Sequence, residues 1–281
     1  MLISLKEMLK NAYTNKYAVG AFNCLSLENV IGAIKAAEEL RSPIIIQLAE
    51  VQFPCAPIEL MAPLYLNAAK AATVPVAVHL DHGESMETCI HAMRLGFGSV
   101  MYDGASLPFA ENVRITREVV RIAKAFGVDV EAELGKVGNA DNNENKKDPD
   151  IYTGVQESLL FIQRTGIDAL AIAIGNKHGH YIATPQLNIA RLTEIHEACE
   201  MPLVLHGGTG TSEEDFKACI HNGICKINVA TAIQLGVTNH LRQYLQSNAN
   251  PDYIEMKEEV VKATKEVVAY HIKLFESEGR F

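Results

Sequence analysis

Three histidines stand out in the sequence, because each follows a short apolar run and has glycine or aspartate beside it. They are His82, His178 and His206. Three neutral imidazoles with an open fourth position are typical of a catalytic divalent-metal site, most often zinc. One such histidine alone is explained by a structural hydrogen bond, but three at equivalent positions predict a metal site. His79 lies inside an apolar run, so we expect it to be buried and hydrogen-bonded or to support the ligands.

Carboxylates close to these histidines are candidates for proton transfer. Asp81 directly precedes His82 and ends an apolar run, so we do not expect it on a solvated face. Asp141 and Glu144 lie in a polar stretch and offer a second acid or base on the opposite side of a substrate. The sequence leaves open which of these two residues acts.

Two later segments carry the pattern of a phosphate site. Residues 207–212 read Gly-Gly-Thr-Gly-Thr-Ser and residues 228–231 read Asn-Val-Ala-Thr, and a helical pattern follows each. Glycines let backbone N–H groups approach an anion, and threonine hydroxyls complete the cradle. A glycine-rich turn alone is weak evidence, but its position beside His206 strengthens the prediction.

Eight short apolar runs alternate with segments of helical periodicity, and these elements must position the candidate residues. The runs lack clean alternation, as expected of parallel strands buried on both faces. They are Tyr17–Phe22, Pro43–Leu48, Pro75–Leu80, Ser99–Tyr102, Val128–Glu133, Ala169–Ile174, Pro202–Leu205 and Ile224–Asn228. The main helix candidates are Ser26–Leu40, Pro57–Ala72, Pro108–Phe126, Val155–Thr165, Asn188–Ala198 and Glu213–His221.

This order predicts an α/β fold, a single (β/α)8 TIM barrel over residues 1–281 with an extra C-terminal helix from about Tyr253 to Glu276. An open doubly wound sheet is less consistent with the sequence, because no glycine-rich phosphate motif follows the first strand. Active sites of such barrels are built from the loops after the strands, where the candidate residues lie. Residues 135–153 are too polar to pack and too long for an ordinary connection, so we expect a mobile active-site loop or an insertion without a role.

Length and composition exclude several classes of protein. The 281 residues suit one barrel, and 48% hydrophobic with 21% charged residues is typical of a globular chain. The net charge of -9 argues against nucleic-acid or anionic-membrane binding, and no apolar run approaches the roughly 18 residues of a membrane span. Six cysteines without a C-x-x-C pair suggest neither a disulfide framework nor a Cys-ligated zinc. Without a signal-peptide pattern at the start, we expect a cytoplasmic protein acting on a small molecule.

The chain resembles a known family over nearly its whole length: the class II, zinc-dependent ketose-bisphosphate aldolases, especially the tagatose-bisphosphate and fructose-bisphosphate branch. The segments that carry this resemblance occur in the family's order and spacing. They are residues 18–23, 79–82, 130–135, 171–179, 203–208 and 226–231.

The resemblance implies a role for each matching residue. His82, His178 and His206 would bind the catalytic zinc, and Asp81 would handle the proton on the substrate oxygen at the cleaved bond. Asp103 and Glu133 would hold a second, spectator divalent metal, and a monovalent cation, Na+ or K+, would sit near the phosphate. Substrate and phosphate contacts would come from Asn23, Gly179, Gly207, Thr209, Asn228, Ala230 and Thr231. The family also implies a homodimer or homotetramer.

The implied reaction is reversible cleavage of a ketose 1,6-bisphosphate, of tagatose or fructose type, or of a ketose 1-phosphate. The products are dihydroxyacetone phosphate and an aldehyde, and zinc stabilises the ene-diolate as a Lewis acid. Lys177 offers a Schiff-base alternative, but its position one residue before a ligand histidine favours the metal mechanism.

Three departures from the family pattern concern the loop and the distal end of the substrate. Asp141 stands where the family's loop carries a catalytic glutamate, and His180 replaces an apolar residue. No clear counterpart exists for the arginine that binds the distal phosphate, and Arg280 is the remaining candidate. The alternatives to a bisphosphate aldolase are a monophosphate substrate, a non-catalytic sugar-phosphate-binding or accessory barrel subunit, and a two-metal hydrolase.

Overall fold

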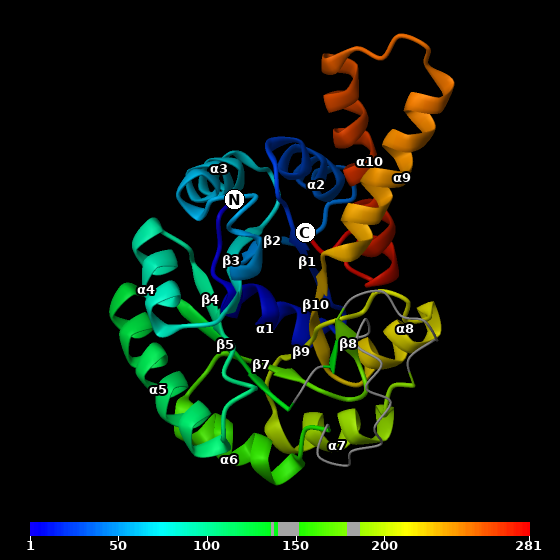
Figure 1. Cartoon of the computed structure of the whole chain (residues 1–281). Coiled ribbons are helices and arrows are strands. Elements are labelled where there is room, and N and C mark those ends of the chain that lie inside the picture. Colours follow the sequence, from blue (N-terminus) through cyan, green and yellow to red (C-terminus); the bar gives the residue numbers. More distant parts are fainter. Residues whose placement is uncertain (136–137, 140–151, 179–185) are drawn as a thin grey trace.

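The computed structural model describes residues 1–135, 138–139, 152–178 and 186–281 (Figure 1). Eight parallel strands close a barrel in the order β1-β10-β9-β7-β5-β4-β3-β2. They are β1 (Val19–Asn23), β2 (Ile44–Ala49), β3 (Val76–Gly83), β4 (Ser99–Tyr102), β5 (Asp129–Leu134), β7 (Ala169–Ile172), β9 (Leu203–Leu205) and β10 (Ile224–Val229). Each overlaps one predicted apolar run, so the predicted barrel is confirmed.

Helices surround the barrel, and one helix follows each barrel strand along the sequence (Figure 1). They are α2 (Leu27–Glu39), α3 (Ile58–Ala71), α4 (Met86–Leu95), α5 (Phe109–Phe126), α6 (Val155–Thr165), α7 (Ile189–Cys199), α8 (Glu213–His221) and α9 (Thr231–Ser247). A single 3-10 turn, η1 (Glu50–Gln52), follows β2. Serine side chains cap the N-termini of α2, α4 and α8, which explains why these helices begin where they do.

An N-terminal helix that the sequence analysis did not predict, α1 (Leu5–Asn15), closes one end of the barrel. Its buried residues Leu5, Met8 and Leu9 pack in one cluster with inward-facing strand residues such as Val19 and Ile45. Because α1 covers the end where the strands begin, the end where the strands finish is left for a site.

The C-terminal helix is confirmed as α10 (Tyr253–Leu274), which packs against α2 and α9 and extends with α9 beyond the ring of helices (Figure 1). Gly32 of α2 permits this contact, since a Cβ atom there would lie 2.6 Å from the backbone oxygen of Val261. Within the described ranges, no helix is long and apolar enough to cross a membrane.

Two short strands outside the barrel, β6 (Gly138–Asn139) and β8 (Lys177–His178), pair in parallel. Asn139 lies opposite His178 in this pair, so the polar stretch after β5 meets the segment that carries a predicted zinc ligand. Asp141, Glu144, Gly179 and His180 lie outside the described residues, as do the side chains of Lys177 and His178.

Candidate active site

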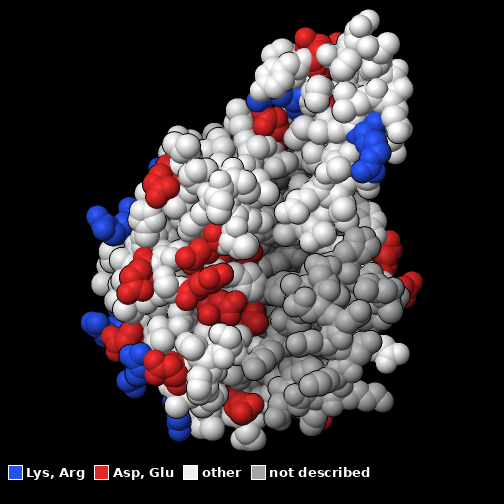
Figure 2. Space-filling model, viewed as in Figure 1, with Lys and Arg blue, Asp and Glu red and all other residues white. Residues whose placement is uncertain are grey.

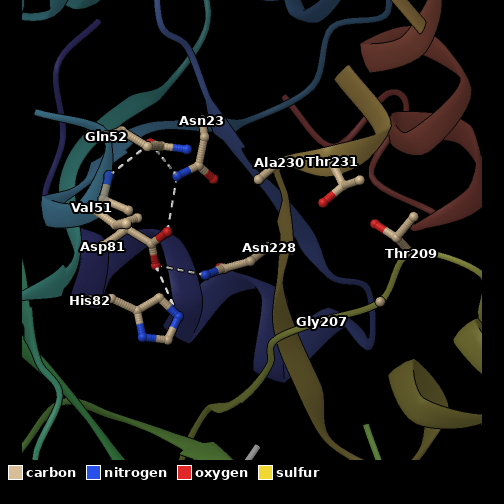
Figure 3. Close-up of a pocket in the computed structure, with 12 residues that line it drawn as sticks. Asn23, Val51, Gln52, Asp81, His82, Gly207, Thr209, Asn228, Ala230 and Thr231 are labelled. Atoms are coloured by element: carbon tan, nitrogen blue, oxygen red, sulfur yellow. Dashed lines mark hydrogen bonds and ion pairs between the residues drawn. The ribbon is translucent and has the colours of Figure 1, made fainter. Parts of the chain in front are cut away.

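The last residues of β3 place two adjacent functional side chains at the mouth of the barrel. The pairing of β3 with β4 shifts register between Leu80 and Gly83, and His82 has a left-handed backbone with φ 41°. A non-glycine residue in this conformation carries strain. The other described residues of this kind follow helix C-termini, whereas His82 lies in a strand, a position where such strain is typical of functional sites. The irregular turn places Asp81 and His82 on the same pocket, although successive residues of a regular strand point to opposite faces (Figure 3).

Asp81 is buried and is held by two side-chain amides that come from β1 and β10 across the barrel mouth (Figure 3). Asn23 Nδ2 donates to Asp81 Oδ2 at 3.0 Å, and Asn228 Nδ2 donates to Asp81 Oδ1 at 2.8 Å. Burial opposes ionisation, but the positive charges of His82, His206 and Lys226 together with the Asn23 hydrogen bond lower the pKa of Asp81 to about 2. Asp81 is therefore an ionised carboxylate with a fixed orientation at neutral pH.

His82 and His206 come from opposite parts of the barrel and meet edge to face, with ring centroids 4.6 Å apart. His82 Nδ1 lies 2.7 Å from Asp103 Oδ2, and His206 Nδ1 lies 3.3 Å from Glu133 Oε2. Burial opposes the charged form of His82, but Asp81 and the Asp103 hydrogen bond raise its pKa to about 10. These carboxylates favour a positive charge at the place where the two rings converge.

Two groups of side chains in this cluster have the spacing of a metal site. One comprises Asp81, His82 and His206, the other comprises His82, Asp103 and Glu133, and the ligand atoms within each group lie within 4.8 Å of one another. Nitrogen and oxygen donors of this kind fit zinc and related divalent ions. The chemistry of the donor set therefore fits a divalent cation. The side chain of His178 lies outside the described residues, so the predicted three-histidine set stays a prediction.

A buried charged network that the sequence analysis did not assign lies beneath these ligands. Glu131 Oε1 lies 2.9 Å from His206 Nε2, and Lys226 Nζ lies 2.9 Å from Glu131 Oε2. His79 completes the network, with Nε2 at 3.5 Å from Glu131 Oε2 and Nδ1 at 2.9 Å from Ser99 Oγ. The expectation that His79 is buried and hydrogen-bonded is confirmed, and desolvation followed by repulsion from Lys226 lowers its pKa to about 3.

A cavity of about 150 Å³ lies beside Asp81 and His82. Eight of the predicted site residues line it: Asn23, Asp81, His82, Gly207, Thr209, Asn228, Ala230 and Thr231. Helix α9 begins at Thr231 without a side-chain cap, so its first backbone N–H groups are available to an anion at this end. Figure 3 shows the hydroxyls of Thr209 and Thr231 on the side of the cavity opposite His82.

Arg280 does not line this cavity. Its guanidinium stacks over the ring of Tyr17 at 5.3 Å, and Tyr17 precedes β1 at the end of the barrel that α1 covers. Within its own chain, Arg280 therefore lies away from the described part of the site.

Sequence and structure comparisons identify the family. The model of the family "Fructose-bisphosphate aldolase class-II" matches residues 3–280. The chain belongs to the class II fructose-bisphosphate aldolase family. This membership confirms the expected enzyme class, a metal-dependent aldolase and hence a lyase.

Relatives within this family are similar over their full lengths. The chain is 38% identical to the uncharacterized protein YdjI of Escherichia coli K12, over 100% of this chain and 99% of that protein. It is 39% identical to a sulfofructosephosphate aldolase of Alkalicoccus urumqiensis, over 99% and 98% of the two chains. The crystal structure of the YdjI aldolase superposes with a TM-score of 0.91 at 36% identity, covering 100% of this chain and 99% of that one.

The fold extends to more distant aldolases. The fructose-bisphosphate aldolase of Campylobacter jejuni superposes with a TM-score of 0.86 over 100% of this chain and 97% of that one, although only 22% of the residues are identical. At this identity the likeness concerns the fold alone.

Proposed function

We propose that the protein is a class II aldolase that reversibly cleaves a ketose phosphate into dihydroxyacetone phosphate and an aldehyde. The substrate is a ketose 1,6-bisphosphate of tagatose or fructose type, or a ketose with a phosphate at carbon 1 only. The observation that carries this proposal is the Asp81 carboxylate, fixed by Asn23 and Asn228 beside His82 and His206.

Retro-aldol cleavage needs a base for the hydroxyl proton and stabilisation of the negative charge on the ketone half. Asp81 is the base in this proposal, because its carboxylate lines the cavity and two amides hold its oxygens in one orientation. In the condensation direction it returns the proton to the same oxygen. Asp141 or Glu144 supplies the proton transfer on the other half of the substrate, as the sequence predicts.

His82 and His206, with His178 as the predicted third ligand, hold the catalytic zinc in this proposal. When bound, zinc acts as a Lewis acid that stabilises the negative charge developing on the ketone side. Asp103 and Glu133 face the same cluster and hold the second divalent cation in the proposal. The predicted site for Na+ or K+ stays a prediction.

The phosphate of the dihydroxyacetone half binds opposite His82 in this proposal, at Gly207, Thr209 and the N-terminus of α9. The free backbone N–H groups of the helix and the positive end of its dipole favour an anion there. Asn228, Ala230 and Thr231 contribute the other contacts, with Gly179 and Asn23 as predicted partners of the substrate.

The distal end of the substrate distinguishes a ketose bisphosphate from a ketose 1-phosphate. Figure 2 shows acidic side chains gathered on the face that carries the mouth, whereas lysine and arginine lie at its periphery. No lysine or arginine lines the described cavity, which supports a ketose with a phosphate at carbon 1 only. Similarity to a sulfofructosephosphate aldolase makes sulfofructose phosphate a second candidate substrate.

A coupled assay for dihydroxyacetone phosphate tests the proposal on fructose and tagatose bisphosphates, ketose 1-phosphates and sulfofructose phosphate. We expect cleavage of at least one substrate, loss of activity in EDTA and its recovery with Zn2+. A fully silent panel with zinc-loaded protein would contradict the aldolase proposal and favour the non-catalytic sugar-phosphate-binding barrel.

We also propose that residues 1–281 form one barrel domain and that the protein is a homodimer or homotetramer. Exposed apolar side chains on α9 and α10, including Leu245, Tyr253 and Ile254, support association. Size-exclusion chromatography with light scattering tests this, and a monomer at micromolar concentration would contradict it. The cytoplasmic location expected from the sequence stays a prediction.

A further inference from the structure

A fully buried lysine that the proposed reaction does not use lies beneath the pocket. Lys226 is 0% exposed, and its Nζ contacts three oxygens: Glu131 Oε2 at 2.9 Å, Glu131 Oε1 at 3.2 Å and Asn228 Oδ1 at 2.8 Å. We propose that Lys226 is a positioning residue that orients both His206, through Glu131, and Asp81, through Asn228. This inference rests on the proposed aldolase function.

The first arm runs from Lys226 through Glu131 to the predicted zinc ligand. Glu131 is 0% exposed, and a buried carboxylate needs a compensating cation, which Lys226 provides. With its charge balanced, Glu131 accepts a hydrogen bond from His206 Nε2 at 2.9 Å. This bond places the ring proton on Nε2 and turns Nδ1 towards the cluster with Glu133, where Nδ1 lies 3.3 Å from Oε2.

The second arm runs from Lys226 through Asn228 to the proposed base. Lys226 and Asn228 are two positions apart on β10, so their side chains share one face of the strand. An ammonium group has only donors, and Asn228 must therefore present its oxygen to Lys226 and its NH2 group to Asp81. Lys226 thus selects the amide orientation that donates to Asp81 Oδ1.

The two arms predict a double defect from one substitution. In Lys226→Met, we expect the Zn2+ affinity of the metal-free protein, measured by chelator competition, to fall about 10- to 100-fold. At saturating zinc we also expect kcat to fall by about tenfold or more, because Asp81 loses its fixed orientation, with a smaller change in KM.

Two further variants separate the arms, and a third serves as a control. Glu131→Gln weakens zinc binding but restores most of kcat when zinc saturates, whereas Asn228→Ala lowers kcat with zinc affinity close to wild type. Lys257→Met is the matched control, because Lys257 forms an ion pair with Glu28 and neither residue lines the pocket. It leaves both zinc affinity and kcat unchanged.

The inference is overturned if Lys226→Met binds zinc as tightly as wild type, even when its melting temperature falls, because a purely structural role predicts that result. If Lys226→Met does not fold, the charge-balanced variant Glu131→Gln/Lys226→Met replaces it and is compared with Glu131→Gln alone. We expect its kcat at saturating zinc to lie about tenfold or more below that of Glu131→Gln, and equal kcat values would overturn the inference. Wild-type protein that cleaves no ketose phosphate defeats the proposed function separately. In that case, the zinc affinity of Lys226→Met and the visible spectrum of its Co2+-loaded form, each compared with wild type, still test whether Lys226 orients His206 through Glu131.

Discussion

The substitution Asp81→Asn distinguishes between the two roles that the pocket permits for this carboxylate. We propose that Asp81 transfers the substrate proton, but one of its oxygens also lies within 4.8 Å of the ligand atoms of His82 and His206. A carboxylate at that spacing is also suited to bind a metal directly. The proposed role predicts lost turnover with retained zinc, whereas the alternative predicts that both are lost.

The size of the effect follows from the two amides around Asp81. Asparagine preserves the shape but replaces one accepting oxygen with an NH2 group, while Asn23 and Asn228 both present N–H donors at 3.0 Å and 2.8 Å. One of these two N–H donors then faces another donor, and we expect this to lower the free energy of unfolding by about 1–3 kcal/mol. Loss of the base lowers kcat about 10²- to 10⁴-fold, or roughly 3–5 kcal/mol of transition-state stabilisation.

Three measurements test this prediction: kcat/KM on the substrate identified by the panel, the zinc dissociation constant, and thermal unfolding. Asp252→Asn is the matched control, because Asp252 caps α10 and asparagine caps a helix equally well. Turnover within tenfold of wild type would refute Asp81 as the base. A fall of 100-fold or more in zinc affinity would show instead that Asp81 is a ligand.

Backbone strain, a buried histidine and one close helix contact give three further predictions. In urea titrations, we expect the free energy of unfolding of His82→Gly to exceed that of His82→Ala by about 1–2 kcal/mol, because glycine adopts φ 41° without steric cost. Equal free energies of unfolding would argue against backbone strain at this position. The pKa of His79 is about 3 in the fold against 6.5 unfolded, so the unfolded chain takes up the proton first. His79 therefore lowers stability by roughly 1 kcal/mol per pH unit as pH drops from 6.5 towards 3, and urea titrations of His79→Gln should show a slope that is smaller by that amount. Gly32→Ala lowers the melting temperature more than Gly98→Ala, whose new Cβ would meet nothing nearer than 3.9 Å, and equal shifts would contradict the α2–α10 packing argument.

The barrel and most of its pocket could be predicted from sequence because both depend on local patterns. Strands buried on two faces read as continuous apolar runs, and the first polar residues after each run mark the carboxyl rim. This rule predicts Asp81 and His82, and the glycine-rich turn after His206 predicts Thr209; all three line the same cavity. Helix α1 was missed although Leu5, Met8, Leu9 and Ala12 have helical spacing and Ser4 caps the first turn.

The network beneath the pocket could not be predicted, because its partners are distant in the chain. Glu131 and Lys226 are 95 positions apart and become neighbours only when β5 and β10 close into the same barrel. Alternation along β5 indicates that Glu131 and Glu133 share a face, but not which strands face them. Glu131 and Lys226 therefore lie within motifs that the sequence shows, but their role becomes evident only in the folded barrel.

The energetics of this network favour function over stability as the reason for its presence. A buried ion pair such as Lys226–Glu131 gains little over well-packed apolar side chains, because desolvation offsets the Coulomb attraction. The interior below it is apolar, where α1 packs against the strands, so a hydrophobic pair at this level would continue an existing core. The charged pair instead stands directly under His206 and Asn228, which contact it through hydrogen bonds. Its position is explained if the barrel retains the charges to orient the site above them, as the Lys226 variants test.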